Sequence, residues 1–243
     1  MSQPAVTALA PPTLDFEIVY SDGEPLESHW HVQQMHFLND LLWQVVREQR
    51  RTDVFFGANQ FVYYSVEQAR EVAELVAKGR KLKFRGPDVF WVNDVMPKAE
   101  RPAWIAWEEG GRLPDVIFEL LSKSNSLRHQ KEKKELYSRV FKTAEYFIYG
   151  PPRFVLEGFR LAGGAYRPIA PDPAGRLWSE QLRCFVGLWH GSYQDLETTW
   201  VRLYRQDGSL ISSPWELADE ERSRAEAAEA ELARLRALLD RQS

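Results

Sequence analysis

The strongest constraint on the fold is one short apolar segment near the middle of the chain. Residues 115–121 read Asp-Val-Ile-Phe-Glu-Leu-Leu, and turn-forming residues stand on both sides of them. A near-continuous apolar run of this length is typical of a strand that is buried on both faces of its sheet. The segment therefore predicts an α/β protein whose sheet is flanked by helices.

Hydrophobic spacing and turn signals predict the other elements. Helices are expected at residues 28–50, 66–78 and 127–141, and strands at 88–92, 144–149, 154–160, 166–169 and 184–188. Residues 54–56 and 61–64 surround a Gly-Ala-Asn turn signal and predict a hairpin. Between 93 and 111 a loop with a short helix is expected.

Composition places the chain among globular proteins, because 44% of its 243 residues are hydrophobic and 27% are charged. No apolar run approaches the ~20 residues of a membrane span. Residues 1–13 lack the pattern of a signal peptide and predict a flexible leader. The single cysteine, Cys184, excludes an internal disulfide, so a cytoplasmic protein is expected.

The formal net charge of −4 argues against a protein that coats nucleic acid through bulk charge. Two stretches, 78–85 and 123–142, are nevertheless rich in Lys and Arg. Such stretches are either ordinary solvated surface or a local rim that binds phosphate.

The end of the chain predicts a separate helix. Ser213 suits the N-cap, Pro214 suits the first helical position, and Ala, Glu, Arg and Leu dominate from there on. A weak heptad seam has Ala218, Ala225, Leu232 and Leu239 at a, and Glu221, Ala228 and Leu235 at d. The seam predicts a coiled coil with another copy, or packing on its own domain. The expected organisation is a leader (1–13), one domain (14–212) and this helix (213–243).

Three ionisable residues stand out by context. Asp88 begins a predicted strand, Glu119 interrupts the apolar run, and Lys133 lies in the helix that follows. A carboxylate buried in an apolar strand costs several kcal/mol unless it is paired or bound to metal. Glu119 is therefore either a functional group, a residue on a solvated strand face, or the partner of a nearby lysine.

Two carboxylates on neighbouring strands would suit a hard cation such as Mg²⁺ or Mn²⁺. Such a cation polarises a phosphodiester and helps to ionise an attacking water. A nearby lysine would orient that water or neutralise the developing charge. Asp88, Glu119 and Lys133 thus have the composition of a site for metal-assisted phosphodiester hydrolysis, provided that their strands are adjacent.

Several segments resemble, in order, the Uma family of restriction-endonuclease-like proteins, which belongs to the PD-(D/E)xK nuclease superfamily. They are Gly86–Val92, Trp107–Gly111, Leu113–Ser124, Lys133–Tyr137, Glu145–Pro151 and Tyr204–Gly208. The resemblance covers about residues 14 to 243. It implies a restriction-endonuclease-like fold with a mixed central sheet.

The resemblance also implies roles for individual residues. Asp88 matches the metal-binding aspartate of the PD motif, and Glu119 matches the acid of (D/E)xK. Leu121 stands where the motif has its lysine. Lys133, four residues before Tyr137, matches the lysine that usually substitutes for it in the Uma pattern.

Four further residues are auxiliary candidates. Glu27 could supply the helical acid that many nucleases of this superfamily add to the metal site, and Tyr137 marks the helix that carries the lysine. His129 replaces a family aspartate and shares a helix face with Lys133, where a surface role is equally open. Asp115 also follows a proline, but four residues along a strand place it about 13 Å from Glu119, so we expect a residue at the rim.

These observations predict a Mg²⁺- or Mn²⁺-dependent endodeoxyribonuclease that acts on DNA as a homodimer, since two-fold symmetry suits cleavage of both strands. The alternative is a catalytically inactive nuclease-fold protein that binds nucleic acid or a protein partner. The missing strand lysine and the acidic net charge favour this alternative. The five histidines have no spacing that would suit a zinc site.

Overall fold

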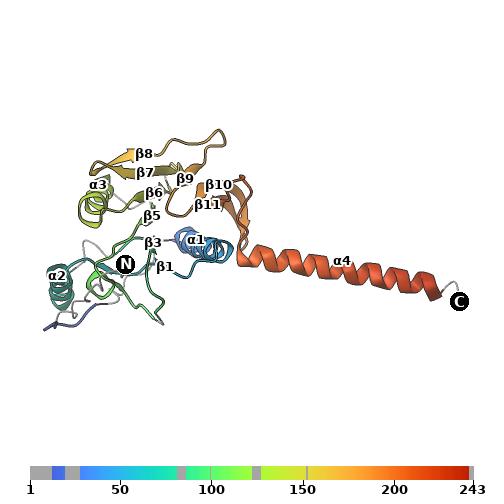
Figure 1. Cartoon of the computed structure of the whole chain (residues 1–243), viewed down its shortest axis with the longest axis horizontal. Coiled ribbons are helices and arrows are strands. Elements are labelled where there is room, and N and C mark those ends of the chain that lie inside the picture. Colours follow the sequence, from blue (N-terminus) through green and yellow to red (C-terminus); the bar gives the residue numbers. More distant parts are fainter. Residues whose placement is uncertain are drawn as a thin grey trace, which may run out of the picture.

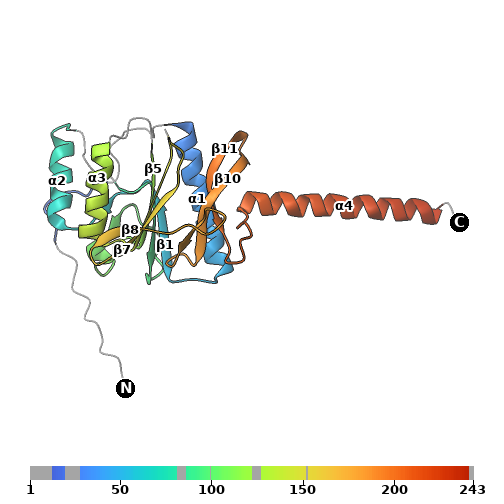
Figure 2. The same cartoon turned by 90° about the horizontal axis from the view of Figure 1, so that it is seen from above.

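The apolar run forms β5 (Val116–Leu120), and all five of its residues are buried within a six-stranded sheet of order β1-β3-β5-β6-β7-β8. Strands β5 and β6 (Glu145–Tyr149) pair in parallel, and the other neighbours are antiparallel. The remaining strands are β1 (Val54–Ala58), β3 (Val89–Asn93), β7 (Glu157–Ala162) and β8 (Ala165–Pro168). The sheet is therefore mixed, as predicted. This computed structural model describes residues 13–19, 28–80, 86–98, 100–121, 127–151 and 153–240 (Figures 1 and 2).

The two faces of β5 are buried against different partners. Val116, Phe118 and Leu120 pack in one hydrophobic cluster with α1 (His29–Glu48). Ile117 belongs to a second cluster, together with residues of the π-helix η2 (Tyr137–Phe141) that continues α3 (Leu127–Leu136). The alternation of strand side chains thus directs Ile117 and Glu119 toward α3 and η2.

Helix α1 begins where the sequence predicts. The Ser28 hydroxyl accepts a hydrogen bond from the His31 backbone N–H at 3.2 Å, which caps the helix. A three-stranded antiparallel sheet, β9 (Leu177–Ser179), β10 (Cys184–Tyr193) and β11 (Leu196–Tyr204), lies beside it. Buried Gln34 fixes this arrangement, because its side-chain amide exchanges hydrogen bonds with both backbone groups of Val201.

The predicted hairpin is wrong. β1 pairs with β3, whereas β2 (Val62–Tyr63) pairs in parallel with β4 (Trp104–Ile105) in a separate two-stranded sheet. Asn59 does turn the chain, with φ 50°, but its N–H bonds to Asp88 O and the chain then leaves the main sheet. Partners this distant in sequence leave no local signal.

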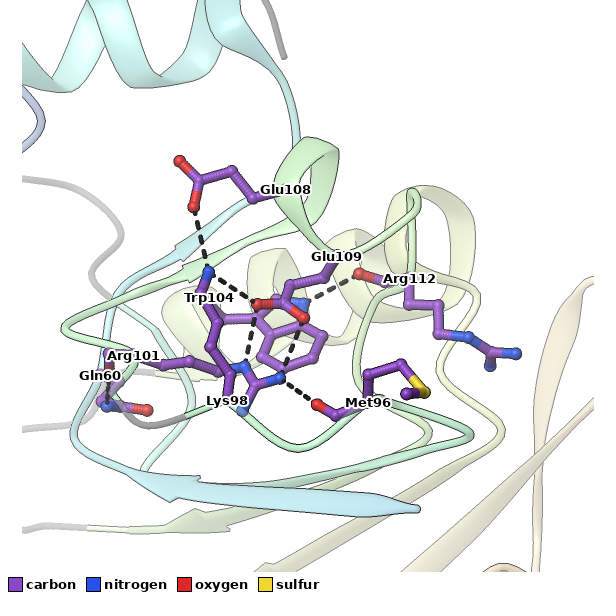
Figure 3. Close-up of polar contacts among 8 residues, drawn as sticks. All are labelled: Gln60, Met96, Lys98, Arg101, Trp104, Glu108, Glu109 and Arg112. Carbon is purple, nitrogen blue, oxygen red and sulfur yellow. Dashed lines mark hydrogen bonds and ion pairs between the residues drawn. The ribbon is translucent and has the colours of Figure 1, made fainter. Parts of the chain in front are cut away.

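The Trp107–Gly111 segment belongs to a polar cluster beside β4 (Figure 3). The Glu109 carboxylate accepts two hydrogen bonds, at 2.9 and 3.1 Å, from the buried Arg101 guanidinium. Arg101 also donates to Met96 O and lies over the Phe55 ring. These contacts join the chain before β4 to the chain after it, so the segment has a structural role.

Helix α4 (Pro214–Asp240) projects away from the α/β body, defined here as α1 through β11 (Figures 1 and 2). Helix α2 (Val66–Ala77) lies at the far side of that body. At the start of α4, Ser213 N donates to the Glu216 carboxylate and Glu216 N donates to the Ser213 hydroxyl, which forms a capping box. No described helix is long and apolar enough to cross a membrane.

Candidate active site

Strand register brings Asp88 and Glu119 together. Val89 lies opposite Phe118 in the antiparallel pair β3–β5, so Asp88, one residue before, comes next to Glu119, one residue after. Residues opposite each other in such a pair project to the same face with Cβ atoms about 5 Å apart. The Leu120 N–H also donates to Asp88 Oδ2 at 2.6 Å, which holds the aspartate against β5.

Glu119 is only 2% exposed, and both of its carboxylate oxygens are engaged. Lys133 Nζ lies 2.6 Å from Oε2, and the Tyr137 hydroxyl donates to Oε1 at 2.6 Å. Lys133 and Tyr137 stand four residues apart, so α3 and the start of η2 present both to the same strand. Of the three roles that the sequence leaves open for Glu119, the solvated strand face is thereby excluded.

A fifth residue, His31, joins Asp88, Glu119, Lys133 and Tyr137 from the first turn of α1. Its Nε2 lies 3.2 Å from Asp88 Oδ1, and the residue is buried. From the sequence, His31 was considered only as a zinc ligand, and its place beside Asp88 was not predicted. A signal was present, because His31, Gln34, Met35 and Leu38 follow the spacing of a buried helix face.

The chain matches one known protein family over most of its length. Residues 7–190 match the Uma2 family, described as "Putative restriction endonuclease". The chain belongs to the Uma2 family. A solved structure titled "a putative nuclease belonging to DUF820", from Anabaena variabilis ATCC 29413, is similar with 14% identity and a TM-score of 0.43, over 70% of this chain and 86% of that one. No curated protein matches.

The family match confirms the resemblance seen in the sequence. In this Uma2 protein, burial and neighbouring charges shift the pKa values of both site carboxyls. Burial raises the pKa of Glu119 to about 7, and the nearby Asp88 charge adds to this, while Lys133 and Tyr137 oppose it. Burial would also raise the pKa of Asp88, but the His31 hydrogen bond and the Lys133 charge hold it below the usual value. The pKa of Glu119 is therefore raised, whereas the pKa of Asp88 is lowered.

The donor set of this Uma2 site fits a hard cation. Asp88 and Glu119 offer four carboxylate oxygens, each with capacity for more than one contact. Mg²⁺ is commonly held by one or two carboxylates, with waters and substrate phosphate completing the shell. Within the described ranges, no cluster of three or more His, Cys, Asp or Glu is arranged to hold a metal ion. Two carboxylates would leave most of the coordination shell of such a cation to water and substrate.

The auxiliary candidates separate in the structure of this Uma2 protein. Glu27 and the His129 side chain lie outside the described residues. Asp115 is at the opposite end of β5, where its Oδ2 accepts a hydrogen bond from Asn93 N at 2.7 Å. Leu121, in the position of the motif lysine, is half-buried and donates its N–H to Tyr149 O at 2.7 Å. Of the four auxiliary candidates, Tyr137 is the one that the described structure places in contact with a site carboxylate, that of Glu119.

Proposed function

We propose that this Uma2 protein is a metal-dependent endonuclease that hydrolyses DNA phosphodiester bonds at Asp88, Glu119 and Lys133. The observation that carries the proposal is the meeting of two carboxylates from adjacent strands with one lysine from the helix that covers them. Buried charges cost free energy, so their retention favours a functional role.

Asp88 and Glu119 would hold Mg²⁺ or Mn²⁺. A bound cation of this kind supplies a Lewis acid for the phosphodiester and lowers the pKa of water. His31 and the Leu120 N–H orient Asp88, and Tyr137 orients Glu119. These contacts fix the carboxylates before any substrate arrives, which is what precise ligand placement requires.

Lys133 would supply positive charge where the phosphate becomes more negative. Its side chain is 30% exposed, so the ammonium can reach both the buried Glu119 and a substrate in solvent. An ammonium group has three donors, so the hydrogen bond to Glu119 is compatible with another to water or phosphate. Lys133 would thus orient the attacking water or stabilise the transition state.

DNA is the substrate that the family description favours, since restriction endonucleases cut DNA. The helix that carries Lys133 supports it. Lys131 and Arg139 are exposed on α3 and η2, the helical segment that carries Lys133. Such residues bind the phosphate backbone without reading its sequence.

Cleavage of supercoiled plasmid in Mg²⁺ tests the proposal. We expect nicked and linear products from the wild type, none with EDTA, and none from Glu119→Gln, which keeps the shape of the side chain without its charge. Glu157→Gln, an exposed glutamate on β7, is the matched control and should cut normally. Equal cleavage by the wild type and Glu119→Gln would overturn the proposal. Binding of the plasmid without cleavage by either would favour the inactive binding protein instead.

A further inference from the structure

Helix α4 exposes an apolar seam that the α/β body does not cover. From Leu217 onward every residue of α4 whose side chain is described is exposed. Leu232 and Leu235 are 54% and 47% exposed although they occupy core positions of the heptad pattern. The structure therefore does not show the seam packed on its own domain (Figures 1 and 2). That packing was one of the two alternatives that the sequence leaves open.

The body fixes the direction in which this helix leaves. Arg202 on β11 is 1% exposed, and its guanidinium bonds to both carboxylate oxygens of Glu216 at 2.9 and 3.1 Å. The same guanidinium lies 4.8 Å from the centroids of the Phe37 and Trp189 rings. A buried, bidentate anchor at the first turn presents α4 as a defined arm, not as a loose tail.

We infer that α4 pairs with α4 of a second copy as a parallel, in-register two-stranded coiled coil. The flanking charges identify the second copy as the partner. In a parallel pair, each g residue contacts the e residue of the next heptad in the other chain, five positions on. Here these contacts join Arg224 to Glu229 of the partner copy, and Glu231 to Arg236 of the partner copy. Each contact joins two opposite charges, and the two-fold symmetry of the pair produces each contact twice.

The core positions select the parallel orientation. In register, Leu232, Leu235 and Leu239 each meet their own equivalents and form one continuous apolar end. An antiparallel overlap of the whole helix would instead place Leu232 against Glu221 and Leu235 against Ala218. Glu221 is the one charged d residue, and it lies near the base, where the Arg224 guanidinium of its own chain neutralises it at 3.2 Å.

Sedimentation equilibrium of the full chain tests this pairing through two single charge reversals. The wild type should show twice the 28.2 kDa of one chain. Arg224→Glu alone and Glu229→Arg alone each turn both symmetric contacts repulsive, and we expect each to weaken the dimer about tenfold. An equimolar mixture of the two variants makes every such contact attractive again, so it should recover the wild-type association. Glu226→Arg, an outward b position, is the matched control and should stay dimeric.

A single-chain mass for the wild type at all concentrations would overturn the inference. So would a dimer that neither reversal weakens, because its interface would lie elsewhere. An antiparallel pair joins Arg224 to Glu231 of the partner copy, so there the mixture of Arg224→Glu and Glu229→Arg would not recover association. All these readouts are masses, which makes them independent of nuclease activity.

Discussion

Lys133 reaches the Glu119 carboxylate from the helix that covers the sheet, with Nζ 2.6 Å from Oε2. A lysine two positions after Glu119 would have shared its strand face, but Leu121 occupies that position. In this structure the amine that contacts Glu119 therefore comes from helix α3 and not from strand β5. This substitution is the basis of our expectation that the site is active.

Replacement of Lys133 by Met should lower the cleavage rate by about 10²–10³-fold, because the transition state loses its stabilising charge. Lys98→Met, at an exposed lysine to which no role in binding or catalysis is assigned, is the matched control. Plasmid nicking rates for both variants provide the measurement. Comparable rates for Lys133→Met and the control would show that Lys133 only pairs with Glu119.

Activity should rise with pH around neutrality. The Glu119 pKa of about 7 means that the ionised, cation-binding form becomes predominant above that pH. The Tyr137 hydrogen bond lowers this pKa, so Tyr137→Phe should move the midpoint of the pH–rate profile upward. A profile recorded from pH 5.5 to 8.5 for both proteins tests this. An unchanged midpoint would mean that another group controls the rate.

The same pKa makes a prediction about stability. The Glu119 pKa is about 7 in the folded protein and 4.5 as its reference value, so between these values the folded state binds more protons than the unfolded state. The free energy of unfolding therefore falls as pH rises through that window. Glu119→Gln removes this contribution, so its stability relative to the wild type should increase from pH 5 to pH 8. Urea unfolding at several pH values measures the free energy of unfolding of both proteins. If the value for Glu119→Gln minus that for the wild type stays constant or falls with rising pH, the raised pKa is contradicted.

His31 should act through Asp88. Its hydrogen bond lowers the pKa of Asp88 and orients the carboxylate, so His31→Phe should weaken Mg²⁺ binding about tenfold. His36→Phe, an exposed position on the same helix, is the control. Calorimetric titration with Mg²⁺ separates this effect from losses in the chemical step. Wild-type Mg²⁺ affinity in His31→Phe would leave His31 as a packing residue.

Local sequence predicted the parts of this protein that depend on neighbours in the chain. The apolar run containing Glu119 shows a buried strand, and the four-residue spacing places Lys133 and Tyr137 on one helix face. The N-cap at Ser28 and the capping signal at Ser213 lie where predicted for the same reason. Each of these features is decided within one or two helical turns or one strand.

Features that depend on distant partners were not predictable in this way. His31 meets Asp88 across 57 residues, so a search for spaced ligands overlooks it. β2 pairs with β4, which lies some 40 residues later in the chain. The sequence predicts a hairpin with β1 instead, because β1 is also rich in aromatic residues and directly precedes β2. β11 was missed because its sequence contains Glu, Thr and Arg, among them buried Arg202, whose partner Glu216 lies beyond the strand.

The Arg202–Glu216 contact yields the last prediction, which concerns the base of α4. Glu216→Gln would remove the negative charge that faces the buried Arg202 guanidinium and replace one of its two acceptor oxygens by an NH2 group. Loss of one partner from a buried ion pair costs about 3 kcal/mol, which for a chain of this size lowers Tm by roughly 6–12 °C. Glu220→Gln, exposed on the same helix, should change stability by less than about 0.5 kcal/mol.

Arg202→Met is the informative comparison, because it removes the charge that needs the partner. Its apolar side chain fits between the Phe37 and Trp189 rings, and Glu216, one-third exposed, can be solvated. The Arg202 Nε is moreover buried with no hydrogen-bond partner seen in the described structure, so the substitution also removes an unsatisfied donor. Arg202→Met should therefore cost less than Glu216→Gln in thermal unfolding. The reverse order would show that the guanidinium contributes mainly through the rings and not through the glutamate.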